Sequence, residues 1–531
     1  MSVFPSLTVK PPKQSNHDLS RKVRTTMAPG VLYPMLVMPV ISGDKVKISM
    51  ESLIKTYPAL SPIMGSFKLQ ADFYFSPLSL YNQRLHHNSD LSIVAPSGTR
   101  QLPDEPFPVI YLPNVLNSTY ENWSVSPDSL LAYLGFPSGY RDCSANLATQ
   151  TEASRPYNAI PLLMYYDIVR NYYANRQELN VPVINQLPWS GAKPYSEVAL
   201  SYLDRLYTSG LTGNIGSSVI ASGGGTIKSL LVNTANSRLG GLALRSYLPD
   251  FKNVILSNSL ASAVGNAASI STTGNSFTVD QFNLASKLYK VYTLSQLAGN
   301  RFSEWLRAQY AVKPDIRVDM PTFIGSTSTD VVFEDVVATA DTGVSGGVGG
   351  VLGSLAGRGR GYADGKSHYF VADQPGYIMC MVSLIPRVDY FQSIERYLLD
   401  VQLSDLFVNN LNGLGLQDVL MADINAVSSV TSTWSSSTNP FTVSYGKQPA
   451  WIHLMTAVNR LFGDFTESSL RGWTLSRVFD ANGATPSSYI QPDLYNYAFA
   501  DTSILAENFL AQFAFTIFKR SNVSKRMQPT I

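Results

Sequence analysis

Apolar and polar residues alternate along several stretches of the chain, and this pattern predicts strands. Apolar side chains occupy every second position of residues 67–75 (FKLQADFYF) and of residues 509–517 (FLAQFAFTI). Successive side chains of a strand point to opposite faces, so both stretches predict strands half-buried on a core. The residues expected on the buried faces are Phe67, Leu69, Ala71, Phe73 and Phe75 in the first stretch and Phe509, Ala511, Phe513, Phe515 and Ile517 in the second.

Two further stretches, DVVFEDVV (330–337) and YIMCMVSLIP (377–386), are rich in strand-forming residues. Proline and glycine separate the expected strands, as is typical of sandwiches and barrels. Helices are fewer. Residues 160–179 carry Pro161 at the first helical turn, where proline is favoured. A second helix is expected from Asp280, a candidate N-cap, through apolar residues near helical spacing.

Tracts rich in Gly, Ser, Thr, Asn and Ala interrupt this pattern and are expected to form long surface loops. The tracts cover residues 209–236, 257–279, 341–367 and 427–448. They lack the large apolar residues that a core requires. The sequence contains no internal repeat.

Composition narrows the class of protein. Only 15% of the 531 residues are charged, the formal net charge is +2, and Tyr and Phe number 29 and 24. A typical protein has about 25% charged residues, so this chain either buries much of its surface against partners or is β-rich with uncharged polar loops. Cys143 and Cys380 form neither a disulfide framework nor a zinc motif. The first residues lack the apolar core of a signal peptide, and the longest apolar run, residues 31–41, is too short to span a bilayer, so a soluble protein is expected.

Both ends of the chain are basic although the whole is nearly neutral. Residues 1–24 are expected to form an extended arm because Pro11 and Pro12 exclude a helix or a central strand. Two interpretations remain open: solvated tails, or surfaces that face a polyanion, since Lys and Arg clusters bind phosphate without reading sequence. The candidate nucleic-acid-facing residues are Arg21, Lys22, Arg24, Lys519, Arg520, Lys525 and Arg526.

Two motifs suggest catalysis, and both lack the necessary context. Gly365-Lys366-Ser367 follows glycines, but Arg360 stands where a phosphate-binding loop needs glycine, and the residues after it predict a strand rather than a helix. These glycines instead suit a flexible loop between two strands. The segment Gly343–Gly347 fits G-x-S-x-G, yet the glycines after it cannot start the required helix.

No metal or cofactor site is expected. The adjacent histidines His86 and His87 would point to opposite faces of an extended chain, and the sequence has no Cys/His cluster at metal-ligand spacing. A large β-rich protein with many tyrosines could also be a carbohydrate-active enzyme or a glycan-binding protein. The paired carboxylates of a glycosidase cannot be recognised from sequence alone, so this alternative stays open.

Several stretches, read in order, resemble one family. They are YNAIPLLMYYDIVRNYYANRQEL (157–179), DMPTFIGSTSTDVVFEDVV (319–337), LGSLAGRGRG (352–361), PGYIMCMVSLIPRVDYFQSIERY (375–397), FTESSLRGWTLSRVF (465–479) and KRMQPTI (525–531). In the first of them, Asn158, Pro161, Tyr165, Tyr166 and Arg170 follow the family layout loosely. This ordered set resembles the major capsid protein of the Microviridae, the small single-stranded DNA bacteriophages, nearest to the lineages that infect Bacteroidetes. The likeness runs from about residue 18 to the end.

The resemblance implies a mainly β fold, an eight-stranded antiparallel jelly roll with long loop and helix-containing insertions. Residues 25–531 would form this single domain, with insertions near 90–155, 190–280, 341–367 and 427–448. Segment 190–280 is the candidate surface protrusion. The protein would be structural rather than an enzyme, with no catalytic residues and no cofactor.

The resemblance also implies the partners. The chain would form an icosahedral T=1 shell from pentameric units, assembled in the host cytoplasm, and package circular single-stranded DNA without sequence preference. A minor pilot protein and a small basic DNA-binding protein would accompany it. Outer loops would contact the host cell surface. No transmembrane segment is expected.

Overall fold

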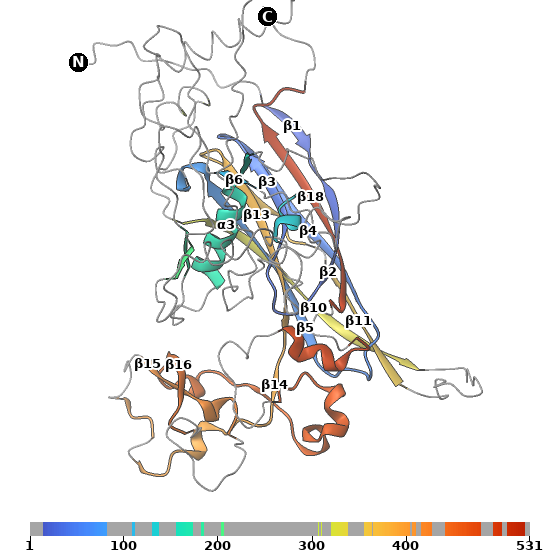
Figure 1. The fold of residues 1–531 in the computed structure, drawn as a ribbon, viewed down its shortest axis with the longest axis vertical. Coiled ribbons are helices and arrows are strands. Elements are labelled where there is room, and N and C mark those ends of the chain that lie inside the picture. The colour runs from blue at the N-terminus through green and yellow to red at the C-terminus, as the bar shows by residue number, and fades with distance from the viewer. Residues whose placement is uncertain are drawn as a thin grey trace, which may run out of the picture.

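The computed structural model describes residues 14–81, 109–111, 130–136, 156–173, 182–184, 203–205, 306, 310, 320–337, 355–363, 365–403, 406–409, 416–426, 441–478, 492–501 and 507–525. One curled antiparallel sheet of ten strands dominates this part of the chain (Figure 1). Its strands are β1 (Ser15–Asp18), β2 (Arg21–Met27), β3 (Tyr33–Val40), β4 (Lys45–Thr56), β5 (Ser66–Pro77), β10 (Thr322–Val337), β11 (Leu355–Ala363), β12 (His368–Val371), β13 (Gly376–Pro386) and β18 (Phe509–Ser521).

The order of these strands is that of a jelly roll. One half of the sheet runs β2-β18-β4-β11, the other half runs β3-β13-β5-β10, and β10 pairs with β11 to join them. Strand β1 extends the line of β2 along β18, and β12 adds to β4. Eight strands in two four-stranded halves, with neighbours distant in sequence, define a jelly roll. The eight-stranded fold predicted from the sequence is therefore confirmed.

Shorter elements surround the barrel. The helical ones are η1 (Leu78–Leu80), α2 (Leu130–Tyr133), α3 (Ile160–Ile168) with its π-helical continuation η3 (Val169–Tyr173), η6 (Arg396–Leu398), η9 (Met421–Asp423), η10 (Ile452–Leu454), η11 (Gly463–Thr466), η12 (Ser468–Trp473) and η13 (Pro492–Ala498). Four two-stranded pairs complete the list: β6 (Val109–Tyr111) with β7 (Pro156–Asn158), β8 (Pro182–Ile184) with β9 (Leu203–Arg205), β14 (Asp389–Tyr390) with β17 (Asn459–Arg460), and β15 (Leu416–Leu420) with β16 (Ser444–Pro449).

The core lies between the two halves of the barrel. All ten residues predicted for the buried faces of residues 67–75 and 509–517 are buried, which confirms both alternation patterns. Phe67 of β5 and Phe509 of β18 come from different halves, and their ring centroids are 4.9 Å apart. Because β5 and β18 are not neighbours in the sheet, this edge-to-face pair bridges the interior and contributes about 0.5–1.5 kcal/mol beyond its buried area.

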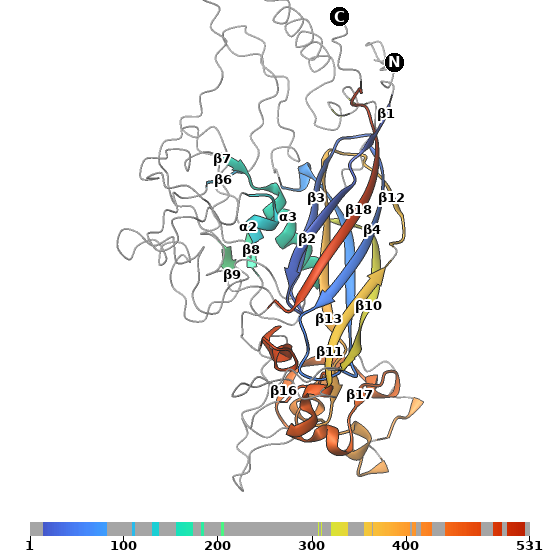
Figure 2. The ribbon, with the colours of Figure 1, turned by 90° about the vertical axis from the view of Figure 1, so that its right-hand side faces the viewer.

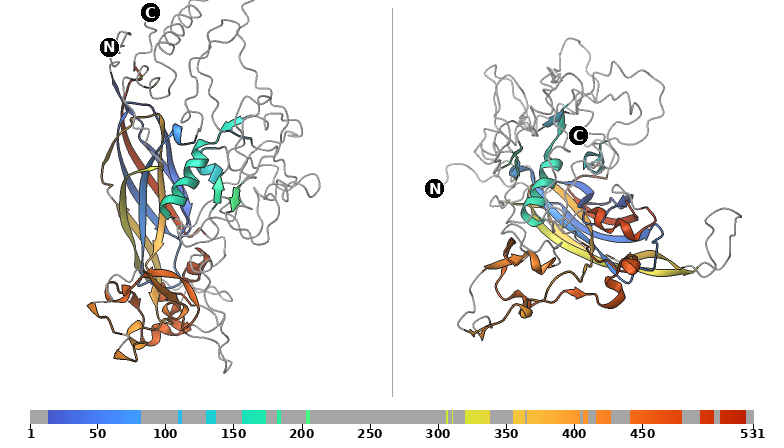
Figure 3. Two further views of the ribbon diagram at one scale, coloured as in Figure 1. Left: turned by 90° about the vertical axis from the view of Figure 1, so that its left-hand side faces the viewer. Right: turned by 60° about the horizontal axis from the view of Figure 1, so that its bottom comes forward.

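The second face of β5 was predicted to be polar, and the structure corrects this. Asp72 and Tyr74 point away from the interior yet are only 3% exposed. Helices explain the difference: the ring of Tyr74 lies 4.7 Å from that of Tyr172 and 6.1 Å from that of Tyr173, both in η3. The helix predicted at 160–179 is confirmed through residue 173, beyond which the structure does not describe it, and Figure 3 (left) shows α3 against this side of the barrel.

Three predicted loop or arm segments are partly wrong. Residues 15–18 and 21–24, expected within an extended arm at residues 1–24, belong to β1 and β2 and pair with β18. Residues 355–363, expected in a flexible loop, form β11 in the middle of the sheet. Residues 444–449, expected to begin in a Ser/Thr-rich loop, form β16. The helix expected from Asp280 and most of the insertions at 90–155 and 190–280 lie outside the described residues.

Close packing explains the glycines of β11. A Cβ atom at Gly359 would lie 2.6 Å from Cγ2 of Thr56, and one at Gly361 would lie 2.9 Å from Cγ2 of Val331. Both distances are far inside van der Waals contact, so only glycine allows the strand to approach β4 and β10 this closely. The alternating glycines mark a strand rather than a loop because they fill the crowded inner face, while Arg358 and Arg360 point outward.

Candidate nucleic-acid interface

In the part of the chain that the structure describes, no helix covers the outer face of the half β2-β18-β4-β11, unlike that of the other half. Figure 2 looks onto β2, β18 and β4, with α2 and α3 to one side. In β4 every second residue faces outward, and these include the exposed residues Lys45, Lys47, Glu51 and Lys55. We call this outer surface the basic face. Its exposed cations are Lys22, Arg24, Lys45, Lys47, Lys55, Arg358, Arg360 and Arg520.

At one end of the basic face, aromatic rings flank a lysine. Strand register places Phe518 of β18 opposite Lys47 of β4, and Lys47 opposite Tyr369 of β12. Phe518 and Tyr369 are 52% and 63% exposed. Neighbouring strands lie about 4.8 Å apart, so Phe518 and Tyr369 stand on strands roughly 10 Å apart, with Lys47 on the strand between them.

The adjacent row adds two cations to the same end of the sheet. Arg520 lies opposite Lys45, which in turn lies opposite Val371. Among the described residues no ion pair involves Arg520, Lys45 or Lys47. An acidic residue, Asp18, lies opposite Phe518. The hydroxyl and backbone N–H of Ser20 donate hydrogen bonds to the carboxyl group of Asp18 and lower its pKa. This carboxylate is therefore hydrogen-bonded within its own turn.

Further along, the basic face mixes cations with polar and apolar residues. Arg24 donates from Nε to Oε1 of Gln512 at 2.8 Å. Lys55 lies opposite Arg360, and Tyr362, which is 60% exposed, lies opposite Leu53. The strands β2, β18, β4, β11 and β12 thus present a continuous outward surface on which exposed cations outnumber exposed acids.

The seven residues predicted from the basic termini lie in five different settings. Lys22, Arg24 and Arg520 lie on the basic face, and Lys525 is exposed just beyond β18. Lys519 faces the opposite way and forms an ion pair with the fully buried Asp44 at 2.6 Å, so a protein carboxylate already balances its charge. Arg21 points into a groove at the seam of the barrel, and Arg526 lies outside the described residues.

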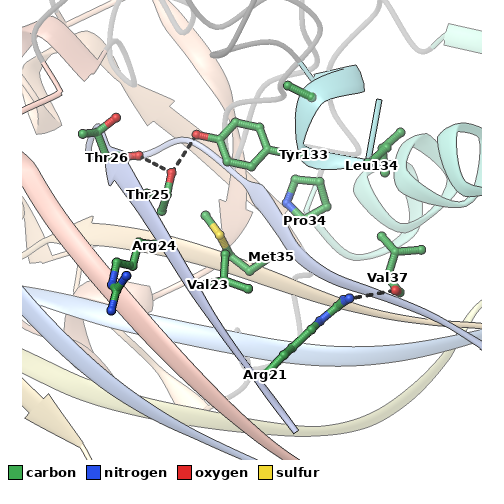
Figure 4. A pocket seen from close by; sticks show the side chains of 12 residues that line it. Arg21, Val23, Arg24, Thr25, Thr26, Pro34, Met35, Val37, Tyr133 and Leu134 are labelled. Atoms are coloured by element: carbon green, nitrogen blue, oxygen red, sulfur yellow. Dashed lines mark hydrogen bonds between the residues drawn. The ribbon is translucent and has the colours of Figure 1, made fainter. Parts of the chain in front are cut away.

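The seam groove lies between β2 and β3, which are neighbours in sequence but do not pair. It has a volume of about 510 Å³, with Val23, Met35 and Val37 on its apolar side and Tyr133 of α2 at one end (Figure 4). Arg21 donates to the backbone oxygen of Val37 at 3.2 Å, and partial burial lowers the pKa of its guanidinium group. This groove could not be predicted from the sequence, because it forms where two strands that follow each other in sequence do not pair.

The candidate catalytic motif Gly365–Ser367 does not precede a helix, as a phosphate-binding loop would. Residues 365–367 lead into the strand β12, as the sequence predicts. The segment Gly343–Gly347 lies outside the described residues. No group of three or more His, Cys, Asp and Glu residues able to hold a metal occurs in the described part of the chain. No helix of that part is both long and apolar enough to cross a membrane.

Comparison with known families identifies the chain. A family model described as capsid protein (F protein) matches residues 227–529, more than half of the sequence. The chain belongs to this capsid protein family. The match includes β10, β11, β12, β13 and β18, which contribute to both halves of the jelly roll. No curated protein matches the chain in sequence.

Membership makes this capsid protein a structural component of a bacteriophage virion in the Microviridae, as the sequence resemblance implied. Its place is the virion capsid, and its first partners are other capsid subunits with which it assembles into a shell. A coat protein is a different class of protein from the carbohydrate-active or glycan-binding alternative.

Proposed function

We propose that this capsid protein holds single-stranded DNA against its basic face inside an icosahedral shell. One observation carries the proposal: the row Phe518–Lys47–Tyr369, with Arg520 and Lys45 beside it, combines exposed rings with cations that form no ion pair among the described residues. Proteins that bind single strands without sequence preference pair a positively charged surface with aromatic side chains on which bases stack.

The geometry of the row suits a single strand better than a duplex. Bases of a single strand are free to rotate onto exposed rings, whereas those of a duplex are already stacked on each other. The cations between and beside the rings meet phosphates, which sets affinity but reads no sequence. Of the residues predicted from the termini, the proposal uses Lys22, Arg24, Arg520 and Lys525. It does not depend on Lys519 or Arg21, whose charges are engaged elsewhere.

The remaining parts of the proposal rest on the family resemblance alone. Pentameric units would build a T=1 shell in the host cytoplasm around circular DNA, together with a minor pilot protein and a small basic protein. Residues 1–24 and 25–531 would act as arm and single domain, although β1 and β2 join the barrel. Outer loops, with 190–280 as the candidate protrusion, would contribute to host attachment.

Binding of a fluorescent single-stranded oligonucleotide tests the proposal. The double change Phe518→Ala with Tyr369→Ala should weaken binding by about tenfold or more, since each stacked base contributes ~1–3 kcal/mol. Tyr397→Ala is the matched control, because Tyr397 is 64% exposed, like Tyr369, but lies far from the basic face in η6. Equal affinity of the double variant and the control would exclude the basic face as the DNA site.

A further inference from the structure

The part of the chain between β13 and β18 forms a separate group of short elements at one end of the barrel, which we call the end module. It contains β14 to β17 and η6 to η12 and lies at the bottom of Figure 1, at the end of the barrel away from β1. Large apolar side chains are exposed on two of its segments. They are Tyr397, Leu398, Val401, Leu403, Leu406, Phe407 and Val408 on the first segment and Leu454, Met455, Val458 and Phe462 on the second.

The two segments lie side by side, so these residues belong to one region of the surface. The rings of Phe407 and Trp451 lie 5.3 Å apart, which joins one end of the first segment to the start of the second. At the other end, Arg460 forms an ion pair with Glu395 at 2.8 Å and donates to the backbone oxygen of Ser393 at 2.7 Å. We call the eleven exposed apolar residues the end-module patch.

The patch is too large to be an ordinary part of a free surface. Leu403 and Val401 are 84% and 82% exposed, and Phe462 is 76% exposed. Aromatic side chains each offer on the order of 200 Å², and aliphatic ones about 100 Å². At the exposures of these three aromatic and eight aliphatic residues, the patch presents roughly 800 Å². The largest apolar patch on a typical monomer is about 300–600 Å², while one side of a stable protein–protein interface covers about 800 Å².

The arginines next to the patch are paired within the module. Arg396 pairs with Asp423 at 2.6 Å, and Arg460 pairs with Glu395. The partner is therefore not a polyanion, for which free cations would be needed. An apolar surface with few free charges is typical of the core of an interface between protein subunits.

We propose that the end-module patch is a contact between copies of this chain in the assembled shell. The occupant is a second copy because the chain belongs to a capsid protein family and its function is to pack against itself. This inference rests on that function and adds which surface is used. The basic face then binds nucleic acid, and the end-module patch contacts a neighbouring subunit.

Charge placed in the patch tests the proposal. The double change Leu403→Asp with Leu454→Asp puts one carboxylate on each segment, and both residues are well exposed, so the subunit should still fold. We expect folded subunits that sediment as small species, with the protein concentration for half-assembly raised about tenfold or more. Leu403→Met with Leu454→Met keeps the surface apolar and should assemble like the wild type. Particles formed by the Asp variant at wild-type concentrations would overturn the proposal.

A second measurement does not depend on any variant. Hydroxyl-radical labelling of Leu403, Leu454 and Phe462 should fall when wild-type subunits enter virions, because a neighbouring copy covers these side chains. Unchanged labelling of the three residues in intact virions would also overturn the proposal. Oligonucleotide binding by the Asp variant separates the two functions: it should equal that of the wild type, because the basic face is unaltered. Loss of DNA binding in the Phe518 and Tyr369 variant concerns the basic face alone.

Discussion

The two halves of the jelly roll share one interior but differ on their outer faces. In β5 the outward residues Asp72 and Tyr74 are buried under η3, whereas in β4 the outward residues Lys45, Lys47 and Lys55 are exposed. The helices that make this difference come from the long insertion between β5 and β10. The described part of this insertion thus buries the outer face of one half under helices. None of its described helices covers the other half, whose outward polar residues stay exposed.

The largest effect should come from truncating matched aromatic residues on the two outer faces. Tyr74→Ala on the covered half should lower the free energy of unfolding by about 3–5 kcal/mol, as for other buried aromatic side chains. Phe518→Ala on the bare half should lower it by under about 1 kcal/mol, because Phe518 is 52% exposed. Urea titration of both variants measures the difference. Similar losses for the two would show that the cover over β5 contributes little stability.

Removing a single hydroxyl group under the helical cover should have a smaller effect on the unfolding free energy. The hydroxyl of Tyr173 donates to Oδ2 of Asp72 at 2.5 Å and accepts from the hydroxyl of Tyr74 at 3.0 Å. Tyr173→Phe leaves the buried carboxylate without this donor and should cost about 1–3 kcal/mol of unfolding free energy.

Tyr369→Phe provides the comparison on the bare half and should change the unfolding free energy by less than about 0.5 kcal/mol. The same urea titrations measure both changes. If Tyr173→Phe proves as mild as Tyr369→Phe, the buried hydrogen-bond network is not a source of stability.

The smallest expected effect is a pH dependence of the unfolding free energy, and it arises in the helix that covers β5. Burial raises the pKa of Asp167 in α3 above its ordinary value of 3.8, although hydrogen bonds from Tyr81 and Asn171 oppose the shift. The native state therefore holds this proton more tightly than the unfolded state, and wild-type stability falls as pH rises through the interval above 3.8.

Asp167→Asn removes this titration, so the stability of the variant relative to the wild type should increase with pH across that interval. Unfolding free energies measured at several pH values between about 4 and 7 test the sign. A difference between variant and wild type that does not change with pH would contradict the expected shift.

Strands whose inner residues are large were predictable from the sequence, and strands whose inner residues are small were not. Phe67 to Phe75 and Phe509 to Ile517 show the alternation directly. The inward positions of β11 are glycines rather than large apolar residues. The sequence therefore shows no hydrophobic alternation there, although the strand has the usual period of two. The basic face was partly predictable: residues 45–56 alternate between Lys45, Lys47 and Lys55 on one side and apolar residues such as Val46 and Ile48 on the other. Its assembly from five strands was not, because it depends on pairing between segments hundreds of residues apart.

The glycines of β11 have a consequence for how the basic face can change in evolution. A strand that fills the interior with side chains must keep both faces compatible with the fold, so changes on one face are constrained by the other. β11 gives the interior only backbone, while Arg358, Arg360 and Tyr362 stand outside. Its outward residues can therefore be exchanged without repacking the core. The edge of the basic face formed by β11 can change its side chains while the backbone of the strand stays in place.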